Sequence, residues 1–301
     1  VIVVSWNTCD LLRDCLRSVY EKTTDCVFDV WVVDNNSQDG TVEMVHSEFP
    51  HVQVIANDFN AGFARANNQA YRQSNSRYVV LLNPDTVLLN PALDVMVGFL
   101  DENPTYGAVG PQLLNADGSV QGTCARPLPN LSTEVRRIMG NRSSRTILNE
   151  ANQNTSQDVD AVSGACIMVR RNILPENILN ERYFMFVEDL ELCWFIRRQA
   201  KTGLYYLASA RILHLEGQSS KKASGLAIEE SYGIYLYMRT TQGLLPSLAS
   251  RSLSLLGAVV RLPRGITFAL SAQSGTYLRE KLGIIAWALG LHPSVGKDRA
   301  K

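Results

Sequence analysis

Asp85 lies shortly after an apolar run that ends abruptly. Residues 78–82 read Tyr-Val-Val-Leu-Leu, which predicts a buried strand, and Asn83-Pro84-Asp85 follows at once. Pro84 lacks a backbone N–H, so the strand has ended by that residue. A carboxylate at this point either closes an Asx turn or binds a hard divalent cation, because Mg²⁺ is typically held by one or two carboxylates together with substrate phosphates.

Asp34 ends a second apolar run, in the segment VVDNNSQDG. One interpretation is a structural turn rich in Asn and Asp. The other is a carboxylate that accepts the imide N–H of a pyrimidine base. A dinucleotide site would instead need a Gly-x-Gly-x-x-Gly turn after the first strand, whereas that turn reads SWNTCD, and the sequence contains no Walker A motif. NAD is therefore disfavoured.

The segment NDFNAGFARANNQAY combines Asn60, Gly62 and Arg65 at the start of an expected helix. A structural interpretation is that Asn60 caps the helix and Gly62 allows a tight turn. Arg65 in the first turn is less expected, because helix N-termini favour anions. A phosphate or base that docks beside the helix would explain it.

Three acids, Glu188, Asp189 and Glu191, fall in one predicted helical turn of the segment FVEDLELCW. Helix N-termini attract carboxylates, so one or two acids are expected on structural grounds. Three acids among aromatic side chains exceed that requirement, and a carboxyl with a raised pKa suits a general base. His214 ends a later strand, and a lone histidine is more often structural than a ligand.

Alternating strands and helices must position these residues. Strands are expected at Val1–Val4, Val27–Val33, Val52–Ala56 and Tyr78–Leu82, with helices over residues 11–20, 41–49, 63–73 and 91–102. This alternation predicts a mostly parallel sheet, in which ligands bind outside the carboxyl ends of the strands. Asn7, Asp34, Asn57 and Asp85 all lie at such ends. We therefore expect them to form one site.

The remaining sequence is less regular. Residues 115–160 are polar and predict irregular structure, whereas SGACIMVRR and LYYLASARILHL predict strands that flank a helix from about Glu188 to Gly203. Beyond residue 226 the sequence predicts amphipathic helices. Twenty-nine basic and 29 acidic residues give a formal net charge of zero, which disfavours nucleic acid as a partner. The six cysteines lack zinc-site spacing and predict buried free thiols in a reducing compartment.

The C-terminal tail mixes apolar patches with cations. No apolar run reaches the ~18 residues that a membrane span needs. Interfacial helices need only an apolar face and flanking cations, and Trp287 would suit the headgroup level. The alternative, of equal weight, is a helical cap that packs on the catalytic domain or on a second subunit. The cations concerned are Arg251, Arg261, Arg264, Arg279 and Lys281.

Seven segments, taken together, resemble the family 2 inverting glycosyltransferases of the GT-A fold, and in particular bacterial rhamnosyltransferases of cell-surface polysaccharide assembly. They span roughly residues 1–220 and are VVSWN, VVDNNSQDG, NAGFARANN, LLNPDT, SGACIMVRR, FVEDLELCWFIRR and HLEGQSS. The resemblance implies an α/β catalytic domain at 1–225, with a nucleotide-sugar half at about 1–110 and an acceptor half at about 111–225. A helical, membrane-associated or packing region follows at 226–301.

The resemblance also implies roles for single residues. Asp34 would contact the nucleotide base, and Asp85 would end the metal motif of Asp-x-Asp type, whose first acid is Asn83 here. Asp189 matches the catalytic base, and His214 matches a residue that helps to bind the metal and diphosphate. The expected nucleotide-binding residues are Asn7, Asp34, Asn60, Arg65 and Asn83.

The expected activity is inverting transfer of a single sugar, with rhamnose as a candidate, from a UDP- or dTDP-linked donor to a glycan or lipid-linked acceptor. The expected cofactor is Mg²⁺ or Mn²⁺, and the expected location is the cytoplasm or the inner face of the membrane. The Gln-x-x-Arg-Trp signature of processive synthases is absent from the sequence. Two alternatives stay open at this point: a nucleotidyltransferase that makes sugar nucleotides, and an inactive nucleotide-sugar-binding module.

Overall fold

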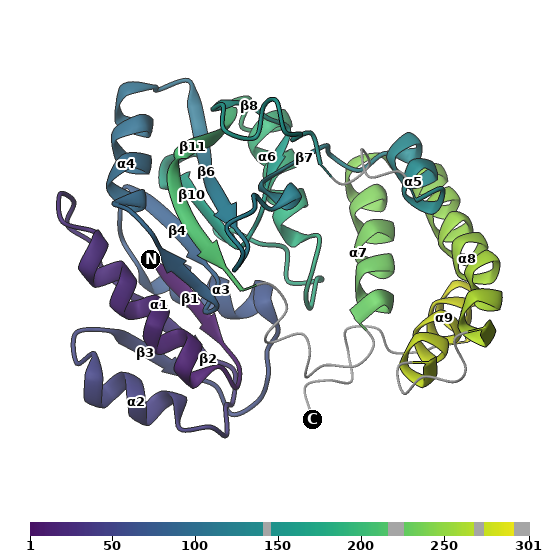
Figure 1. Ribbon diagram of the computed structural model, residues 1–301, viewed down its shortest axis with the longest axis horizontal. Helices are drawn as coiled ribbons and strands as arrows, with labels where there is room; N and C mark the ends of the chain where they lie inside the picture. The colour runs from purple at the N-terminus through teal and green to yellow at the C-terminus, as the bar shows by residue number, and fades with distance from the viewer. Residues whose placement is uncertain (141–145, 216–225, 268–273, 292–301) are drawn as a thin grey trace.

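The structure is a computed structural model that describes residues 1–140, 146–215, 226–267 and 274–291 (Figure 1). Within these residues nine strands form one sheet in the order β3-β2-β1-β4-β10-β6-β11-β5, and β8 pairs with β11. The strands are β1 Ile2–Ser5, β2 Trp31–Asp34, β3 Gln53–Ala56, β4 Tyr78–Leu82, β5 Thr86–Leu88, β6 Tyr106–Leu114, β8 Gln157–Asp158, β10 Cys166–Arg170 and β11 Gly203–His214. A separate two-stranded sheet pairs β7 Ala125–Arg126 with β9 Ala161–Val162.

The helices of the sheet region follow the expected order. They are α1 Cys9–Lys22, α2 Thr41–Glu48, α3 Phe63–Gln73, α4 Ala92–Glu102 and α6 Glu188–Arg198. The strands β1, β2, β3 and β4 run parallel, as do β6 and β11, whereas β10 and β5 are antiparallel to their neighbours. The predicted mostly parallel sheet is therefore confirmed. Ser5 of β1 lies beside Asp34 of β2, so the carboxyl ends of the parallel strands meet at one edge.

The two expected halves share this sheet. β4 of the first half pairs along its whole length with β10 of the second, from Leu82 beside Cys166 to Tyr78 beside Arg170. Buried apolar side chains from both halves form a single continuous core. The cysteines are all free thiols, and Cys15, Cys124, Cys166 and Cys193 are buried.

Two local predictions were wrong. The second strand begins at Trp31, not Val27, because Trp31 is the first of its residues to pair with β1, opposite Ile2. Val27 is fully exposed. Residues 115–160 are not wholly irregular, since they contain α5 Leu131–Ile138. Asn130 caps this helix by accepting a hydrogen bond from the Thr133 backbone N–H, and the Thr133 hydroxyl accepts one from the Asn130 backbone N–H.

Three further helices follow the sheet region: α7 Leu226–Thr241, α8 Leu244–Thr267 and α9 Ser274–Ala288. α7 packs on α6, α8 and α9, and α5 joins this group by packing on α8. Figure 1 shows α5, α8 and α9 beyond α7, away from the sheet. Among the described residues, no helix combines the length and the apolar character that crossing a membrane demands.

Trp287 does not lie at the surface, as the interfacial interpretation required. It is 6% exposed and meets the rings of Tyr232 and Tyr235 edge-on, with the Arg251 guanidinium 5.4 Å from its ring. Arg261 likewise points inward and donates to the backbone carbonyls at the end of α5. These side chains hold the helices to one another. The Arg264 side chain lies outside the described residues.

Candidate active site

Asp34 is buried at the carboxyl end of β2. Its Oδ2 accepts a hydrogen bond of 2.8 Å from the Ser37 backbone N–H. Its Oδ1 is equally buried, yet within the described residues no donor pairs with it. Burial raises the pKa of this carboxyl, and the hydrogen bonds from Ser37 partly offset that effect. An unpaired buried acceptor is costly, so Oδ1 is poised to accept a hydrogen bond from a ligand.

The loop after Asp34 is fixed by the loop after β1. Asn7 has a positive φ of 54°. Its backbone N–H donates a hydrogen bond of 2.8 Å to the side-chain hydroxyl of Ser37. The Asn7 Oδ1 accepts in turn from the Gln38 backbone N–H at 2.8 Å. Asn7 therefore shapes the loop after Asp34 and is linked to Asp34 through Ser37.

Asn35 ties the same loop to the start of α3. It accepts hydrogen bonds from Asn57 and from the Ala61 backbone N–H, and it donates to the Gly62 carbonyl. Gly62 has a φ of 81°, and a Cβ there would lie 2.7 Å from the Phe184 carbonyl oxygen. The Phe63 backbone N–H donates to that same oxygen at 2.8 Å. Only glycine allows the segment before α6 to approach α3 this closely.

Asn60 and Arg65 lie on this turn, but in a different arrangement from the one predicted. Gly62, not Asn60, is the helix-capping residue, and Asn60 accepts a hydrogen bond from the Gly62 N–H at 3.0 Å. Arg65 is exposed in the first turn, with its guanidinium 5.5 Å from the Phe59 ring. Asn60 is therefore linked to the Asp34 loop through Ala61 and Gly62, whereas Arg65 reaches solvent beside it.

Asp85 and His214 form a buried pair at the end of β4. The His214 Nε2 lies 3.4 Å from the Asp85 Oδ1 and 3.4 Å from the Asn83 side-chain nitrogen. The Leu215 backbone N–H donates to the Asp85 carbonyl at 2.9 Å, which fixes the end of β11 against this turn. The structure thus brings together the three residues that the sequence assigned to the metal motif. The segment 216–220, which holds the rest of HLEGQSS, lies outside the described residues.

Gln121 orients the imidazole of His214, and nothing in the sequence pointed to it. The amide nitrogen of Gln121 donates to the His214 carbonyl and to Asn115, both at 2.9 Å. Its Oε1 is therefore left to accept from the His214 Nδ1, also at 2.9 Å. With the proton on Nδ1, the Nε2 lone pair faces Asp85 and Asn83.

The Asp85–His214 pair fits a divalent cation. A lone pair and a carboxylate that face each other across 3.4 Å repel, unless a proton or a cation lies between them. Adjacent ligands of an octahedral ion at ~2.1 Å are ~3 Å apart, close to the observed separation. No cluster of three or more His, Cys, Asp or Glu side chains able to hold a metal occurs in the described part of the chain. The pair therefore suits an ion that completes its coordination with phosphate oxygens and water.

Asp189, the predicted base, is linked to this pair through two consecutive residues before β10. The Gly164 backbone N–H donates to the Asp189 Oδ2 at 2.9 Å, and the Ala165 carbonyl accepts from the Asn83 N–H at 2.9 Å. A Cβ on Gly164 would lie only 2.8 Å from the Asp189 Cβ. The Asp189 side chain remains 13% exposed, so it can reach a substrate. One short segment thus positions both acids.

Glu188 behaves differently from its neighbour. It is buried, and its Oε2 has no hydrogen-bond partner among the described residues. Burial, followed by the charge of Asp189, raises the pKa of Glu188 to about 8. This carboxyl is therefore mainly protonated at neutral pH.

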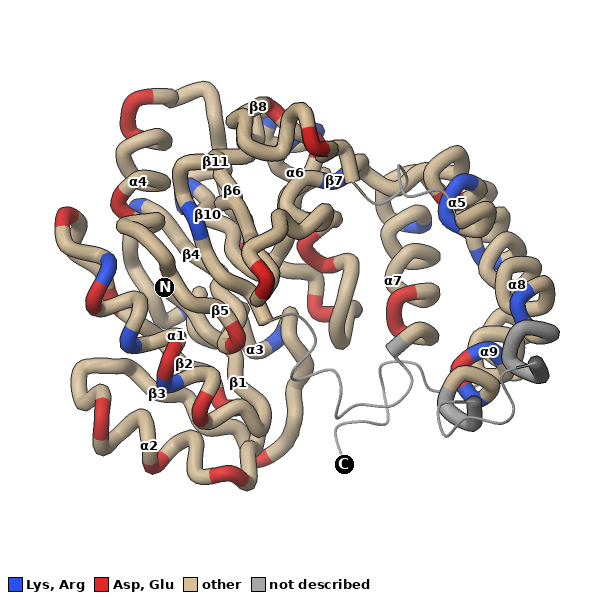
Figure 2. The backbone as a smooth tube through the Cα atoms, viewed as in Figure 1, with Lys and Arg blue, Asp and Glu red and all other residues tan. Residues whose placement is uncertain are grey.

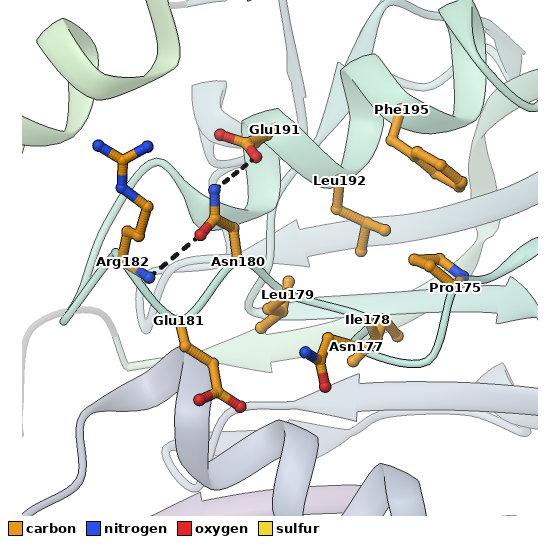
Figure 3. A pocket seen from close by; sticks show the side chains of 10 residues that line it. All are labelled: Pro175, Asn177, Ile178, Leu179, Asn180, Glu181, Arg182, Glu191, Leu192 and Phe195. Atoms are coloured by element: carbon orange, nitrogen blue, oxygen red, sulfur yellow. Dashed lines mark hydrogen bonds between the residues drawn. The ribbon is translucent and has the colours of Figure 1, made fainter. Parts of the chain in front are cut away.

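Glu191 has a structural role. It accepts hydrogen bonds from Asn180 at 2.9 Å and from the Tyr183 hydroxyl. Figure 3 shows Glu191 at the wall of a hollow of about 550 Å³ between α6 and residues 175–182. Asp34, Asp85 and Asp189 do not line this hollow, and we do not assign it to the site.

Arg126 was also missed by the sequence interpretation. Its Nη1 lies 3.8 Å from the Asp189 Oδ2, and its backbone belongs to the small β7–β9 sheet. No local sequence signal marks Arg126, because the contact joins segments far apart along the chain.

Similarity to known proteins identifies the family of this chain. The model of glycosyl transferase family 2 matches residues 1–177. The chain belongs to glycosyl transferase family 2. Family 2 membership supports a glycosyltransferase over a nucleotidyltransferase or an inactive binding module. The family 2 match ends before Asp189 and His214.

Two curated relatives of this family 2 chain cover most of its length. A Mycobacterium tuberculosis N-acetylglucosaminyl-diphospho-decaprenol L-rhamnosyltransferase is 28% identical over 75% of this chain and 80% of its own length. The Haloferax volcanii low-salt glycan biosynthesis hexosyltransferase Agl10 is 22% identical over 79% of this chain and 72% of its own length.

Solved structures share the fold. The mannosyltransferase PcManGT from Pyrobaculum calidifontis, in complex with GDP-Man and Mn²⁺, has a TM-score of 0.55 and 15% identity over 96% of this chain and 85% of its own. S. aureus TarS 1–349 in complex with UDP has a TM-score of 0.53 and 16% identity over 96% of this chain and 80% of its own. The predicted GT-A fold is thereby confirmed.

Proposed function

We propose that this family 2 enzyme transfers a single sugar, with rhamnose as the first candidate, from a UDP- or dTDP-linked donor to a hydroxyl of a glycan or lipid-linked acceptor. The transfer inverts the anomeric configuration and depends on Mg²⁺ or Mn²⁺. The observation that carries the proposal is the buried, unpaired Oδ1 of Asp34, which lies at the same sheet edge as Asp85.

The unpaired oxygen favours a pyrimidine base. Uracil and thymine each carry an imide N–H that Asp34 would bind, and both bases offer the same edge, so either nucleotide fits. The name of the mycobacterial relative supports rhamnose and a diphosphate-linked acceptor for this chain. The name of the Haloferax volcanii relative, a glycan biosynthesis hexosyltransferase, supports a role in the assembly of a polysaccharide.

Asp85, His214 and Asn83 would hold the cation and the diphosphate. A divalent ion at this position neutralises the negative charge that develops on the leaving diphosphate. Asn7, Asn60 and Arg65 shape and flank the nucleotide side of the site.

Asp189 would accept the proton of the acceptor hydroxyl. The Gly164 N–H and the Leu190 N–H hold its two oxygens at 2.9 and 2.8 Å, which orients the carboxylate before a substrate arrives. The deprotonated hydroxyl attacks the anomeric carbon from the face opposite the leaving diphosphate. One base and one displacement leave no covalent intermediate, so the configuration inverts, as in inverting glycoside hydrolysis.

Calorimetric titration with UDP, dTDP, GDP and ADP in the presence of Mn²⁺ tests the donor class. We expect UDP or dTDP to bind and the purine nucleotides to bind at least tenfold more weakly. Asp34→Asn should remove most of this preference, because an amide cannot replace a carboxylate acceptor without penalty (~1–3 kcal/mol). Preferred binding of GDP or ADP would overturn the assignment of Asp34.

The helices beyond the sheet offer a surface for a lipid-linked acceptor. Leu245, Leu248, Leu256 and Val259 of α8 are exposed at intervals that return to one helical face, and Leu282 of α9 and Leu289, just beyond its end, are also exposed. Arg279 of α9 is exposed, whereas Arg251 and Arg261 of α8 bond to neighbouring helices; Figure 2 shows where basic residues fall along these helices. Interfacial helices combine these two features, and we propose that this region lies on the membrane surface.

Flotation with vesicles of anionic or zwitterionic lipid tests this surface. A Leu245→Ser, Leu256→Ser, Val259→Ser variant removes three exposed apolar side chains of this face, each worth roughly 1 kcal/mol, so binding to anionic vesicles should fall about tenfold or more. The matched control is Val27→Ser with Leu89→Ser, which changes exposed apolar residues of the sheet region. If the wild-type chain fails to float at low salt, the helices are a packing element.

A further inference from the structure

Arg126 is held in place by its backbone and not by its side chain. It pairs with Ala161 across the β7–β9 sheet, and β9 leads within a few residues to Gly164. Gly164 is the residue whose N–H holds Asp189. The position of Arg126 relative to the proposed base is therefore fixed by a short, paired stretch of backbone.

The guanidinium of Arg126 makes few polar contacts within the described residues. Its side chain is 27% exposed, and its one recorded ion pair, to Asp189, is long at 3.8 Å. Across the described residues no hydrogen bond involves this side chain, although arginine carries five N–H donors. Other arginines near the sheet are used fully: Arg170, for example, donates to the carbonyls of Tyr106, Leu100 and Asn103.

The surrounding charges leave Arg126 able to attract an anion. Asp189 is the carboxyl group that lies nearest to it, and the neighbouring Glu188 is buried with its pKa raised to about 8. The Asp189 side chain therefore lies against one side of the Arg126 guanidinium. An anion that contacts the opposite side of the guanidinium is close to the cation and farther from Asp189, so attraction exceeds repulsion.

We propose that Arg126 binds the phosphate of the acceptor, so that the acceptor is a sugar joined to its lipid through a phosphate or diphosphate. This inference rests on the proposed function and deepens it by naming the residue that recognises the acceptor phosphate. One acceptor sugar carries both the hydroxyl that reacts and the phosphate on its anomeric carbon. The Asp189 Oδ2 and the Arg126 Nη1 lie 3.8 Å apart, and a hydrogen bond from each adds ~2.9 Å, so the two side chains can contact both groups of one sugar.

The chain beyond Arg126 leads in the direction that such an acceptor requires. Residues 127–130 connect Arg126 directly to α5, and the Pro129 carbonyl accepts a hydrogen bond from Gln242, just before α8. α5 packs on α8, and Met139 at its end is 78% exposed. A phosphate at Arg126 would therefore have its lipid directed toward the exposed apolar helices.

Hexyl diphosphate, an acceptor fragment without a sugar, is the probe that tests Arg126. Calorimetry would use the full chain with its nucleotide site already saturated by UDP or dTDP and Mn²⁺, so that the probe cannot occupy the donor diphosphate position. Loss of a charge-assisted hydrogen bond should weaken probe binding on the order of 10- to 100-fold in Arg126→Gln. Arg126→Lys keeps the charge and should lose less.

Arg198→Gln is the matched control, because it removes an exposed arginine at the other end of the helix that carries Asp189, and it should leave probe binding unchanged. Unchanged nucleotide binding shows that each variant is folded. Equal probe affinity in the wild type and Arg126→Gln, or no probe binding in the wild type, overturns the inference. If nucleotide fails to bind at all, the proposed function fails instead, and the Arg126→Gln comparison is made without nucleotide and metal.

Discussion

The donor side and the acceptor side of the site are built in different ways. Around Asp34, Ser37 bonds to both Asn7 and Asp34, and one buried acceptor is left unpaired. Around Asp189, the backbone N–H groups of Gly164 and Leu190 hold the carboxyl group, whereas the side chain of Arg126 lies 3.8 Å away. The Asp34 site is preformed and lacks only one hydrogen-bond donor, which a planar base can supply. The Asp189 site instead presents charged side chains that a substrate can contact. Donor binding and sugar transfer should therefore be separable by mutation.

The largest effect is expected at Asp85, where the two sides meet. Asp85→Asn removes a carboxylate from the proposed cation site, and loss of several kcal/mol of charge stabilisation lowers the transfer rate by about 10³-fold or more. Mn²⁺-dependent nucleotide binding should be lost with it, while thermal unfolding shows an intact fold. Full activity in EDTA would contradict this assignment.

Asp189→Asn should separate the two sides most cleanly. Transfer is expected to fall by at least ~10²-fold, the usual contribution of a general base, with the donor dissociation constant unchanged. Glu191→Gln is the control: its hydrogen bonds to Asn180 and Tyr183 are structural, so it should cost ~1–3 kcal/mol of stability and little activity. A larger loss of transfer in Glu191→Gln than in Asp189→Asn would show that the base is misassigned.

Gly164→Ala tests whether the position of the base matters. The added Cβ would lie 2.8 Å from the Asp189 Cβ and must displace it, and a misplacement of ~1 Å can cost up to ~10²-fold in rate. We expect transfer to fall roughly 10- to 100-fold with donor affinity retained. Gly98→Ala in α4 is the matched control, since nothing lies within 4 Å of the added Cβ. A fully active Gly164→Ala variant would show that this close approach is not needed.

The smallest effect concerns stability against pH at Glu188. Its pKa rises from 4.5 to about 8 on folding, so the folded chain binds the proton more tightly than the unfolded chain does. The contribution of Glu188 to stability is fully present below pH 4.5 and is lost as the pH rises toward 8, by at most ~1.4 kcal/mol per pH unit. Urea unfolding of Glu188→Gln should show a flatter dependence over this window. Parallel pH profiles for variant and wild type would contradict the buried, protonated state.

Sequence patterns predicted the donor side better than the acceptor side. The bounds of β4 and α3 match the prediction because β4 is a continuous apolar run, α3 has helical periodicity, and each has a clear stop; Asp34 ends β2 and Asp85 comes three residues after β4. α5 was missed although its Asn130 cap is a local signal, because the helix is only eight residues long and lies in a polar stretch. Arg126 and Gln121 could not be predicted, since each gains its place only through contacts between distant segments.

The tail shows the limit of residue type as evidence. Trp287 and Arg251 were interpreted as membrane anchors, but a tryptophan and an arginine also stabilise helix packing, and here they face each other within the helices. The exposed residues of α8 depend on which face α7 and α9 cover, and only the packed structure determines that.

The anomeric configuration of the product tests the central claim most directly. The full chain would be incubated with Mn²⁺, the accepted UDP- or dTDP-sugar and a diphosphate-linked acceptor, and the new glycosidic linkage analysed by NMR. A single displacement with Asp189 as base predicts a linkage of configuration opposite to that of the donor, and no linkage in Asp189→Asn. A product that retains the donor configuration would require a second displacement and would contradict the account.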